Sequence, residues 1–280
     1  MIGVAGTGTM GRGIALLVAT SGQDVLVWGR SEASVTSLRS HVSKWAARKV
    51  EQGSLTAEES AVVLSRIRGT TRLEELVAAN FVIESVAEEL ALKRNLFCTL
   101  DGLCPGTTVI GTNTSSLLVR EIAASVASPE RVIGTHFMNP PSAVPLVELV
   151  PTEKTSRTTL DKALSLCRSL KKEPLIVPDS PGFVLNRALF GMIREAVKLL
   201  ESETVEAQTV DAALKLGARH PMGPLELADF IGLDICARIM ENLSLELQDV
   251  GYSPPRLLQE KVAQGELGRK SGRGFYSYEG

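Results

Sequence analysis

Ile2-Gly3-Val4-Ala5-Gly6-Thr7-Gly8-Thr9-Met10-Gly11 is the stretch of sequence that decides the fold. A short apolar run leads straight into the spacing G-x-G-x-x-G, and the apolar residues after it predict a helix. Gly6 permits a tight turn, Gly8 lets a pyrophosphate approach the backbone, and Gly11 lets the helix pack against the strand. A glycine-rich turn without a ligand is the alternative. The strand before and the helix after favour a dinucleotide site, with contacts expected from Gly6, Gly8, Thr9, Met10 and Gly11.

Strand-like and helix-like segments alternate through the rest of the first part of the chain. Short runs rich in β-branched residues lie at 2–5, 24–28, 81–84, 107–112 and 131–137. Helical spacing of apolar residues lies between them, at 10–20, 32–52, 90–103 and 119–125. This alternation predicts an α/β fold with a Rossmann-type, doubly wound, mostly parallel sheet.

The pattern changes at Asp179-Ser180-Pro181-Gly182, where turn residues interrupt the chain and the strand signals largely stop. Helical spacing then dominates, at 183–200, 204–216, 224–247 and 254–264. We therefore expect two domains. Residues 1–181 form an NAD(P)-binding domain, and residues 182–280 form an all-α C-terminal domain.

Composition excludes several classes of partner. Lys and Arg number 30 against 32 Asp and Glu, and the net charge of −2 provides no general attraction for nucleic acid. The four cysteines lie far apart with no zinc-binding spacing, so we expect reduced thiols and no metal site. No segment approaches the roughly 18 uninterrupted apolar residues that a membrane span requires. A cytoplasmic protein with no membrane contact is expected.

The end of the second predicted strand bears on cofactor choice. It reads Val27-Trp28-Gly29-Arg30-Ser31, without the carboxylate that usually binds the ribose 2′-OH of NAD. The guanidinium of Arg30 could instead pair with the 2′-phosphate of NADP. The alternative is that Arg30 is simply a solvated loop residue.

A histidine and a glutamate form a candidate acid/base pair. His136 ends a predicted strand in Arg131-Val-Ile-Gly-Thr-His136-Phe-Met-Asn139-Pro140, and ligands bind at strand carboxyl ends in open α/β sheets. Glu148 lies within the apolar run Pro145 to Val150, where a carboxylate needs a partner. Brought together, the two would make a base that can take an alcohol proton. A histidine near a proline turn is more often structural, so spacing leaves the role open.

The sequence resembles the 3-hydroxyacyl-CoA dehydrogenase family, including bacterial 3-hydroxybutyryl-CoA dehydrogenases, over essentially its whole length. Six stretches carry the resemblance, in the family's order. They are Gly6-Thr-Gly-Thr-Met-Gly-Arg-Gly-Ile-Ala15, Asn113-Thr-Ser-Ser116, Arg131-Val-Ile-Gly-Thr-His-Phe-Met-Asn-Pro140, Asp179-Ser-Pro-Gly-Phe-Val-Leu-Asn-Arg187, His220-Pro-Met-Gly-Pro-Leu-Glu-Leu-Ala-Asp229 and Gly268-Arg-Lys-Ser-Gly-Arg-Gly-Phe-Tyr276.

The resemblance implies the roles of individual residues. His136 is then the general acid/base, and Glu148 orients and polarises it. Substrate contacts around the reacting C3 oxygen are implied for Ser115 and Asn186. Cofactor contacts are implied for Asn113 by the nicotinamide, Glu88 and Lys93 near its ribose, and Lys270 in a C-terminal segment that returns toward the cofactor. Gly29 departs from the family, whose members usually carry Asp there.

A charged stripe on the long predicted helix 32–52 is a candidate for CoA binding. Ser40, Lys44 and Arg48 recur every four residues and so share one face. Such a stripe is usually a solvated surface, and His41 beside it is interpreted as a solvated helix residue. In the resembling family the equivalent helix contacts CoA, which makes phosphate binding by this stripe the competing interpretation.

The resemblance, together with the dinucleotide loop and the candidate acid/base pair, implies an L-3-hydroxyacyl-CoA dehydrogenase. The expected reaction is reversible hydride transfer between NAD(P)(H), with a preference for NADP(H), and C3 of a short-chain substrate such as 3-hydroxybutyryl-CoA or acetoacetyl-CoA. A homodimer is expected, because the C-terminal apolar stripes exceed what a small helical bundle can bury. Two alternatives are an enzyme for carrier-protein-linked or free polar hydroxy acids and a non-enzymatic relative. Retention of His136, Glu148, Ser115 and Asn186 together argues against the second.

Overall fold

A computed structural model describes residues 1–202 and 205–278 of the chain. The chain divides into two compact units, Met1–Ser180 and Pro181–Gly280. The division falls one residue before the predicted boundary, at the turn residues that follow the last strand.

An eight-stranded sheet forms the centre of the first unit. Its strands are β1 (Ile2–Ala5), β2 (Val25–Trp28), β3 (Ile67–Thr70), β4 (Phe81–Glu84), β5 (Val109–Thr112), β6 (Val132–Phe137), β7 (Leu146–Val150) and β8 (Glu173–Ile176). Their spatial order is β3-β2-β1-β4-β5-β6-β7-β8, and every pair is parallel except β6 with β7. Successive strands are added on one side of β1 as far as β3, and on the other side from β4 onward, so the strand order reverses between β1 and β4. Open α/β sheets bind ligands at such a point.

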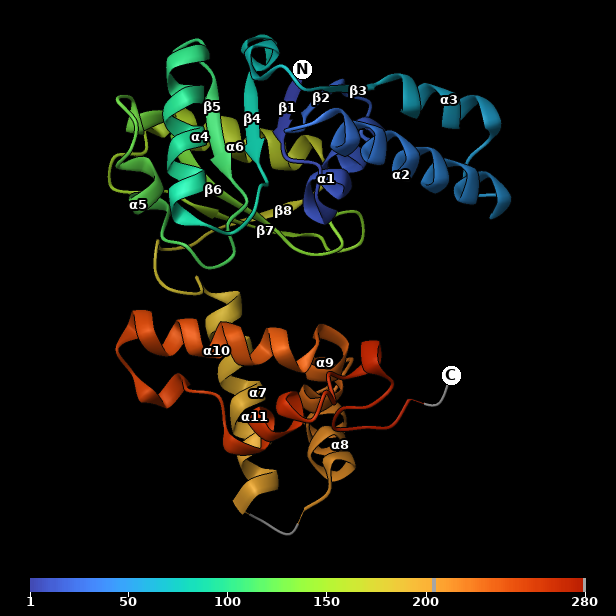
Figure 1. Ribbon diagram of the computed structural model, residues 1–280, viewed down its shortest axis with the longest axis vertical. Helices are drawn as coiled ribbons and strands as arrows, with labels where there is room; N and C mark the ends of the chain where they lie inside the picture. The colour runs from blue at the N-terminus through green and yellow to red at the C-terminus, as the bar shows by residue number, and fades with distance from the viewer. Residues whose placement is uncertain (203–204, 279–280) are drawn as a thin grey trace. The chain divides into compact units, whose positions relative to one another are not determined.

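Helices cover both faces of this sheet. They are α1 (Thr9–Thr20), α2 (Glu32–Glu51), α3 (Ala57–Ser65), α4 (Leu90–Leu103), α5 (Val119–Ala123) and α6 (Arg157–Ser169), with short 3-10 helices η1 (Leu73–Ala78) and η2 (Pro129–Arg131). Apolar side chains of α1, α2, α3 and α6 share one core with the strands. Figure 1 shows α4 and α5 on the opposite face from α6. The predicted class, a doubly wound and mostly parallel α/β sheet followed by helices, is confirmed.

The elements of this unit that the sequence did not predict include the strands β3 and β8 and the helices α3 and α6. β3 reads Ile-Arg-Gly-Thr and β8 reads Glu-Pro-Leu-Ile, and both lie at sheet edges with partly exposed side chains. Edge strands lack the continuous apolar run that marks a central strand. α6 combines a strongly polar composition with buried Ala163, Leu166 and Cys167, so its apolar face is narrow.

The second unit is helical. Its helices are α7 (Leu185–Ser202), α8 (Ala207–Gly217), α9 (Pro224–Ile231), α10 (Leu233–Leu247) and α11 (Arg256–Ala263), with 3-10 helices η3 (Val250–Tyr252) and η4 (Arg269–Ser271). The prediction of a single helix over 224–247 is wrong, because the helix is interrupted at Gly232. The backbone of this glycine has φ 107°, a value that residues with a side chain rarely adopt, although the apolar spacing continues across it. The helix predicted from Thr204 begins outside the described residues.

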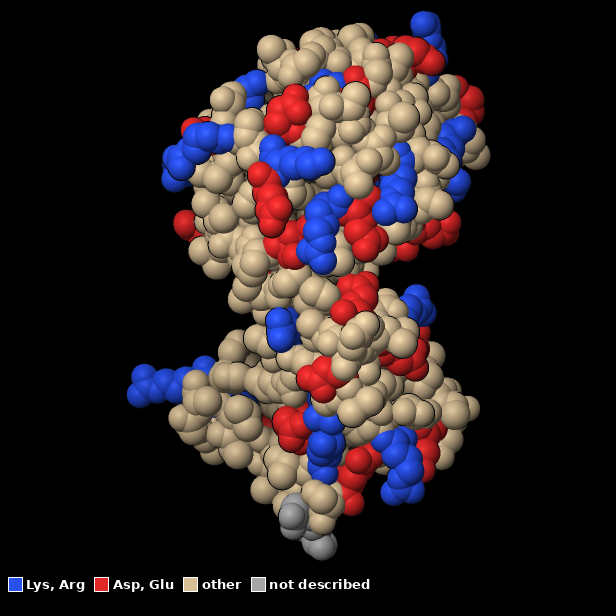
Figure 2. Space-filling view, turned by 90° about the vertical axis from the view of Figure 1, so that its left-hand side faces the viewer, with Lys and Arg blue, Asp and Glu red and all other residues tan. Residues whose placement is uncertain are grey.

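Across the described parts of the chain, no helix is both long enough and apolar enough to cross a membrane. Charged side chains of both signs are interspersed on the face seen in Figure 2, consistent with the near-balance of acidic and basic residues in the sequence.

Candidate active site

The glycine loop follows β1, next to the point between β1 and β4 where the strand order reverses. Gly6 has φ 134°, and a Cβ there would collide with the carbonyl oxygen of Ser85. A Cβ on Gly11 would collide with the carbonyl of Gly6, so both glycines are required by close backbone packing. Gly8 differs, since nothing lies within 4 Å of its Cβ position. The loop therefore leaves open space at its middle glycine, where a ligand can approach the backbone.

The helix after this loop is suited to phosphate. Thr9 and Met10 begin α1, and its N-cap, Gly8, has an extended backbone and makes no side-chain capping bond. The N–H groups of the first turn are then directed at whatever lies above the loop. These residues fit the pyrophosphate of a dinucleotide.

Residue 29, directly after β2, has little room for a side chain. A Cβ on Gly29 would collide with the hydroxyl oxygen of Ser34 and lie 2.9 Å from Cγ2 of Thr7. Ser34 is held there by the capping box at the start of α2, in which Ser31 and Ser34 bond to each other's backbone N–H groups. Arg30 is exposed. Residue 29 thus has no carboxylate and little room for a side chain, and the next residue, Arg30, is an exposed cation.

Positive charges gather on α1 and α2. Lys44 and Arg48 of the predicted stripe are exposed on α2, as is Ser40. Arg12 of α1, which the sequence analysis did not single out, reaches across and donates to Ser37 Oγ at 2.9 Å. Partial burial lowers the pKa of His41, and the nearby cations Arg12, Arg48 and Lys44 lower it further. His41 is therefore part of a cationic surface.

His136 and Glu148 face each other across the antiparallel pair β6 and β7. The distance between His136 Nδ1 and Glu148 Oε2 is 2.8 Å, and the two side chains are 8% and 2% exposed. Directly opposite residues in such a pair project from the same face, so the register itself brings them together. The structure thus contains a buried histidine–carboxylate pair, with β6 placing His136 next to the strand end.

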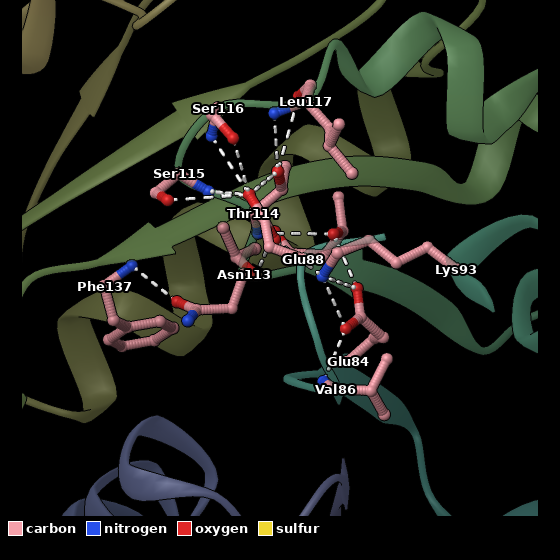
Figure 3. A network of polar contacts seen from close by, with 12 residues as sticks. Glu84, Val86, Glu88, Lys93, Asn113, Thr114, Ser115, Ser116, Leu117 and Phe137 are labelled. Carbon is pink, nitrogen blue, oxygen red and sulfur yellow. Dashed lines mark hydrogen bonds and ion pairs between the residues drawn. The ribbon is translucent and has the colours of Figure 1, made fainter. Parts of the chain in front are cut away.

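Asn113 connects the end of β5 to this strand. Its side-chain oxygen accepts a hydrogen bond of 2.9 Å from the backbone N–H of Phe137, the residue after His136 (Figure 3). The Asn113-Thr-Ser-Ser116 segment therefore starts beside the histidine strand.

Glu88 holds the rest of that segment. Its Oε1 accepts hydrogen bonds from the hydroxyl of Thr114 at 2.5 Å, the N–H of Ser115 at 2.8 Å and the N–H of Ser116 at 3.1 Å (Figure 3). Burial acts to raise the pKa of Glu88, but the charge of Lys93 and these donors outweigh it, so the pKa is lowered. Glu88 is consequently an anion that fixes the position of the Ser115 backbone.

Lys93 lies beneath Glu88 and is only 1% exposed. Its Nζ is 2.7 Å from Glu84 Oε1 and 3.1 Å from Glu88 Oε2. Of the two residues expected near the cofactor ribose, Glu88 is the one that reaches solvent, with 34% of its side chain exposed. Glu84, at the end of β4, was not predicted as a site residue, because in the sequence it is only the last residue of an ordinary strand.

Asn186 and Lys270 both belong to the second unit. Asn186 is half-buried near the start of α7. Lys270 lies in η4 and pairs with Asp234 of α10, with 2.5 Å between Nζ and Oδ1. No group of three or more potential metal ligands occurs within residues 1–202 and 205–278.

Comparison with known proteins covers both units. Residues 1–180 match the model of the 3-hydroxyacyl-CoA dehydrogenase NAD binding domain, and residues 182–278 match that of the C-terminal domain. A probable 3-hydroxybutyryl-CoA dehydrogenase of Bacillus subtilis is 44% identical over 276 residues, covering 99% of this chain and 96% of that protein. The 3-hydroxybutyryl-CoA dehydrogenase of Clostridioides difficile is 40% identical, covering 99% of both chains.

A solved structure agrees in fold. The crystal structure of (S)-3-hydroxybutyryl-CoA dehydrogenase from Ralstonia eutropha superimposes with a TM-score of 0.94 at 40% identity, covering 100% of this chain and 99% of that one. Family models match both domains, and relatives of nearly the same length are 40% and 44% identical to the chain. The chain belongs to the 3-hydroxyacyl-CoA dehydrogenase family.

Proposed function

We propose that the protein is an L-3-hydroxyacyl-CoA dehydrogenase acting reversibly at C3 of a short-chain substrate such as 3-hydroxybutyryl-CoA or acetoacetyl-CoA. The observation that carries this proposal is the buried contact of 2.8 Å between His136 and Glu148, in a chain of this family. When bound at the glycine loop, the nicotinamide dinucleotide supplies or accepts the hydride. The chain's own residues handle the proton and the oxygen.

His136 acts as the general acid/base in this proposal. With Nδ1–H donating to Glu148, the proton of the substrate hydroxyl is taken by the other ring nitrogen, Nε2. The charge that then arises on the imidazole is stabilised by the buried carboxylate of Glu148. In the reductive direction the same nitrogen returns the proton.

Ser115 and Asn186 are proposed to donate hydrogen bonds to the C3 oxygen. Charge builds on this oxygen in the transition state, and donors held in place lower the barrier. The anchoring of Ser115 by Glu88 supports this role, because a donor of this kind acts only if its position is fixed. For Asn113, Glu88, Lys93 and Lys270 the cofactor roles stay proposals.

We further propose that NADP(H) is used at least as well as NAD(H). Residue 29 is glycine, so the group that binds the 2′-OH and repels a 2′-phosphate is missing, and a Cβ there would collide with Ser34 Oγ. Arg30 is exposed, and none of the hydrogen bonds or ion pairs found among the described residues involves it. It is thus available to a 2′-phosphate.

The CoA phosphates are proposed to bind the stripe Ser40, Lys44 and Arg48. The lowered pKa of His41, caused by burial and by Arg12, Arg48 and Lys44, supports a concentration of positive charge on this surface. An anionic ligand there would be attracted even though the whole chain carries a net charge of −2.

A homodimer in the cytoplasm completes the proposal. Leu216, Leu245 and Val250 of the helical unit are 84%, 76% and 84% exposed, which is unusual for large apolar side chains and supports an interface. None of the four cysteines forms a disulfide, which supports a reducing compartment.

Steady-state kinetics with acetoacetyl-CoA, using NADH and NADPH in parallel, test the reaction, the substrate and the cofactor together. Free acetoacetate serves as the matched substrate without CoA. The proposal expects turnover with the thioester and at most a trace with the free acid. Equal rates on the two would favour an enzyme for free hydroxy acids.

A further inference from the structure

Glu84 lies among three hydrogen-bond donors at the end of β4. Its Oε1 accepts from the N–H of Val86 at 2.7 Å and from Lys93 at 2.7 Å. Its Oε2 accepts from the hydroxyl of Thr112 at 2.7 Å and from Lys93 at 2.9 Å. Each oxygen of this buried group therefore accepts two hydrogen bonds. An amide could not replace it, because its NH2 group would face donors.

The ammonium of Lys93 connects this carboxylate to Glu88. Lys93 and Glu84 are 1% and 0% exposed, so the position of the ammonium is set by its two partners and not by water. Glu88 in turn accepts hydrogen bonds from the hydroxyl of Thr114 and the N–H of Ser115 (Figure 3). The chain of contacts thus runs from the core of the sheet to the Ser115 segment.

We propose that Glu84 is a positioning residue for the reaction: through Lys93 and Glu88 it holds the segment that presents Ser115 to the substrate. This inference rests on the proposed function, which places Ser115 at the reacting oxygen. Glu84 lies on β4, beside β1 at the reversal of the sheet, and its backbone carbonyl also accepts from the N–H of Asn113 at 2.8 Å.

Glu84→Gln is the variant that tests this role. The new amide NH2 must face either Lys93 and Val86 or Lys93 and Thr112, and in both orientations a donor opposes the ammonium. Lys93 is then displaced, and Glu88 and Ser115 move with it. Because misplacement by about 1 Å can cost about a hundredfold in rate, kcat should fall about ten- to a hundredfold. KM for acetoacetyl-CoA should change by less than about threefold, since a donor acting in the transition state is what is lost.

The chain offers a matched control at the other end of α4. Asp101 pairs with Arg131 at 2.7 Å, with side chains 7% and 5% exposed, and also accepts from the N–H groups of Ala127 and Ser128. Asp101→Asn therefore weakens a comparable buried ion pair on the same helix. Arg131 lies just before the start of β6, at the sheet edge away from the strand carboxyl ends. The control should lower Tm about as much as Glu84→Gln but keep kcat within about twofold of wild type.

Hydrogen–deuterium exchange of the cofactor-free protein gives a readout independent of turnover. In Glu84→Gln, the amides of Ser115 and Ser116 should exchange faster, because their acceptor on Glu88 is no longer fixed. In Asp101→Asn, faster exchange should be confined to the region of Ala127 and Ser128. If Glu84→Gln does not fold, Thr112→Val removes, without a change of charge, the hydroxyl that donates to Glu84 at 2.7 Å and accepts from the N–H of Thr114 at 3.3 Å. It should give a smaller change in the same direction.

The results separate this inference from the proposed function. Folded Glu84→Gln with wild-type kcat and wild-type exchange at residues 114–116 would overturn the positioning role, as would equal loss of kcat in Asp101→Asn. If wild type shows no turnover of acetoacetyl-CoA with either cofactor, the proposed function fails. The exchange comparison then still decides whether Glu84 holds this segment.

Discussion

Glu148→Gln removes the negative charge beside His136 while leaving an oxygen that can still accept from Nδ1–H. The contact of 2.8 Å is of charge-assisted length, and the side chains are 8% and 2% exposed, so water screens the interaction little. A hydrogen bond to a charged group contributes about 1.5–3 kcal/mol. If this stabilisation is realised when the imidazole becomes charged, kcat should fall about ten- to a hundredfold. KM for the substrate should change little, because the loss appears only in the transition state.

Steady-state oxidation of 3-hydroxybutyryl-CoA measures this change, and a double-mutant cycle with His136→Ala isolates its origin. If Glu148 acts through His136, then Glu148→Gln should have almost no further effect once His136 is alanine. Full additivity of the two losses would refute the dyad. So would a Glu148→Gln enzyme with unchanged kcat.

Other predictions concern the cofactor, CoA and assembly. Arg30→Ala should weaken NADP(H) binding about ten- to a hundredfold, with little change for NAD(H); equal affinities before and after would show that Arg30 faces solvent in the complex. Gly29→Asp should shift preference toward NAD(H) most when combined with Ser34→Ala, which removes the hydroxyl oxygen that would collide with the new Cβ; an unchanged preference in the double variant would show that other residues set the choice. Lys44→Ala with Arg48→Ala should raise KM for acetoacetyl-CoA about tenfold at low salt, and less at high salt, unless the stripe is merely solvated. Light scattering should give about twice the chain mass of 30.0 kDa, and a monomer at micromolar concentration would exclude the dimer.

Local patterns were enough to predict the central part of the fold. The apolar run, the glycine spacing and the helix after them each act over a few residues, so β1, the loop and α1 could be located from the sequence. The edge strands β3 and β8 could not, because their side chains are half solvated and lack a continuous apolar run. Gly232 was overlooked for a related reason, since apolar periodicity does not report a backbone with positive φ.

The candidate site was predictable where residue type alone suggests chemistry. His136 and Glu148 were paired by their chemical needs, but their contact depends on the register of β6 and β7, which spacing does not determine. Glu84 has no such signal. Its role depends on four hydrogen bonds from three donor groups, which the fold brings around it. The collision that a Cβ at residue 29 would make with Ser34 likewise depends on how α2 begins.

We propose that His136 transfers the proton while hydride moves between a nicotinamide cofactor and C3 of the acyl-CoA. The most direct test of this proposal is the rate at which purified wild type and His136→Ala consume NADH or NADPH with acetoacetyl-CoA, measured beside cofactor affinity. We predict turnover by wild type and a loss of about 10²- to 10⁴-fold in kcat in the variant, with cofactor affinity nearly unchanged. Wild-type turnover in His136→Ala, or none in wild type with either cofactor, would contradict this account.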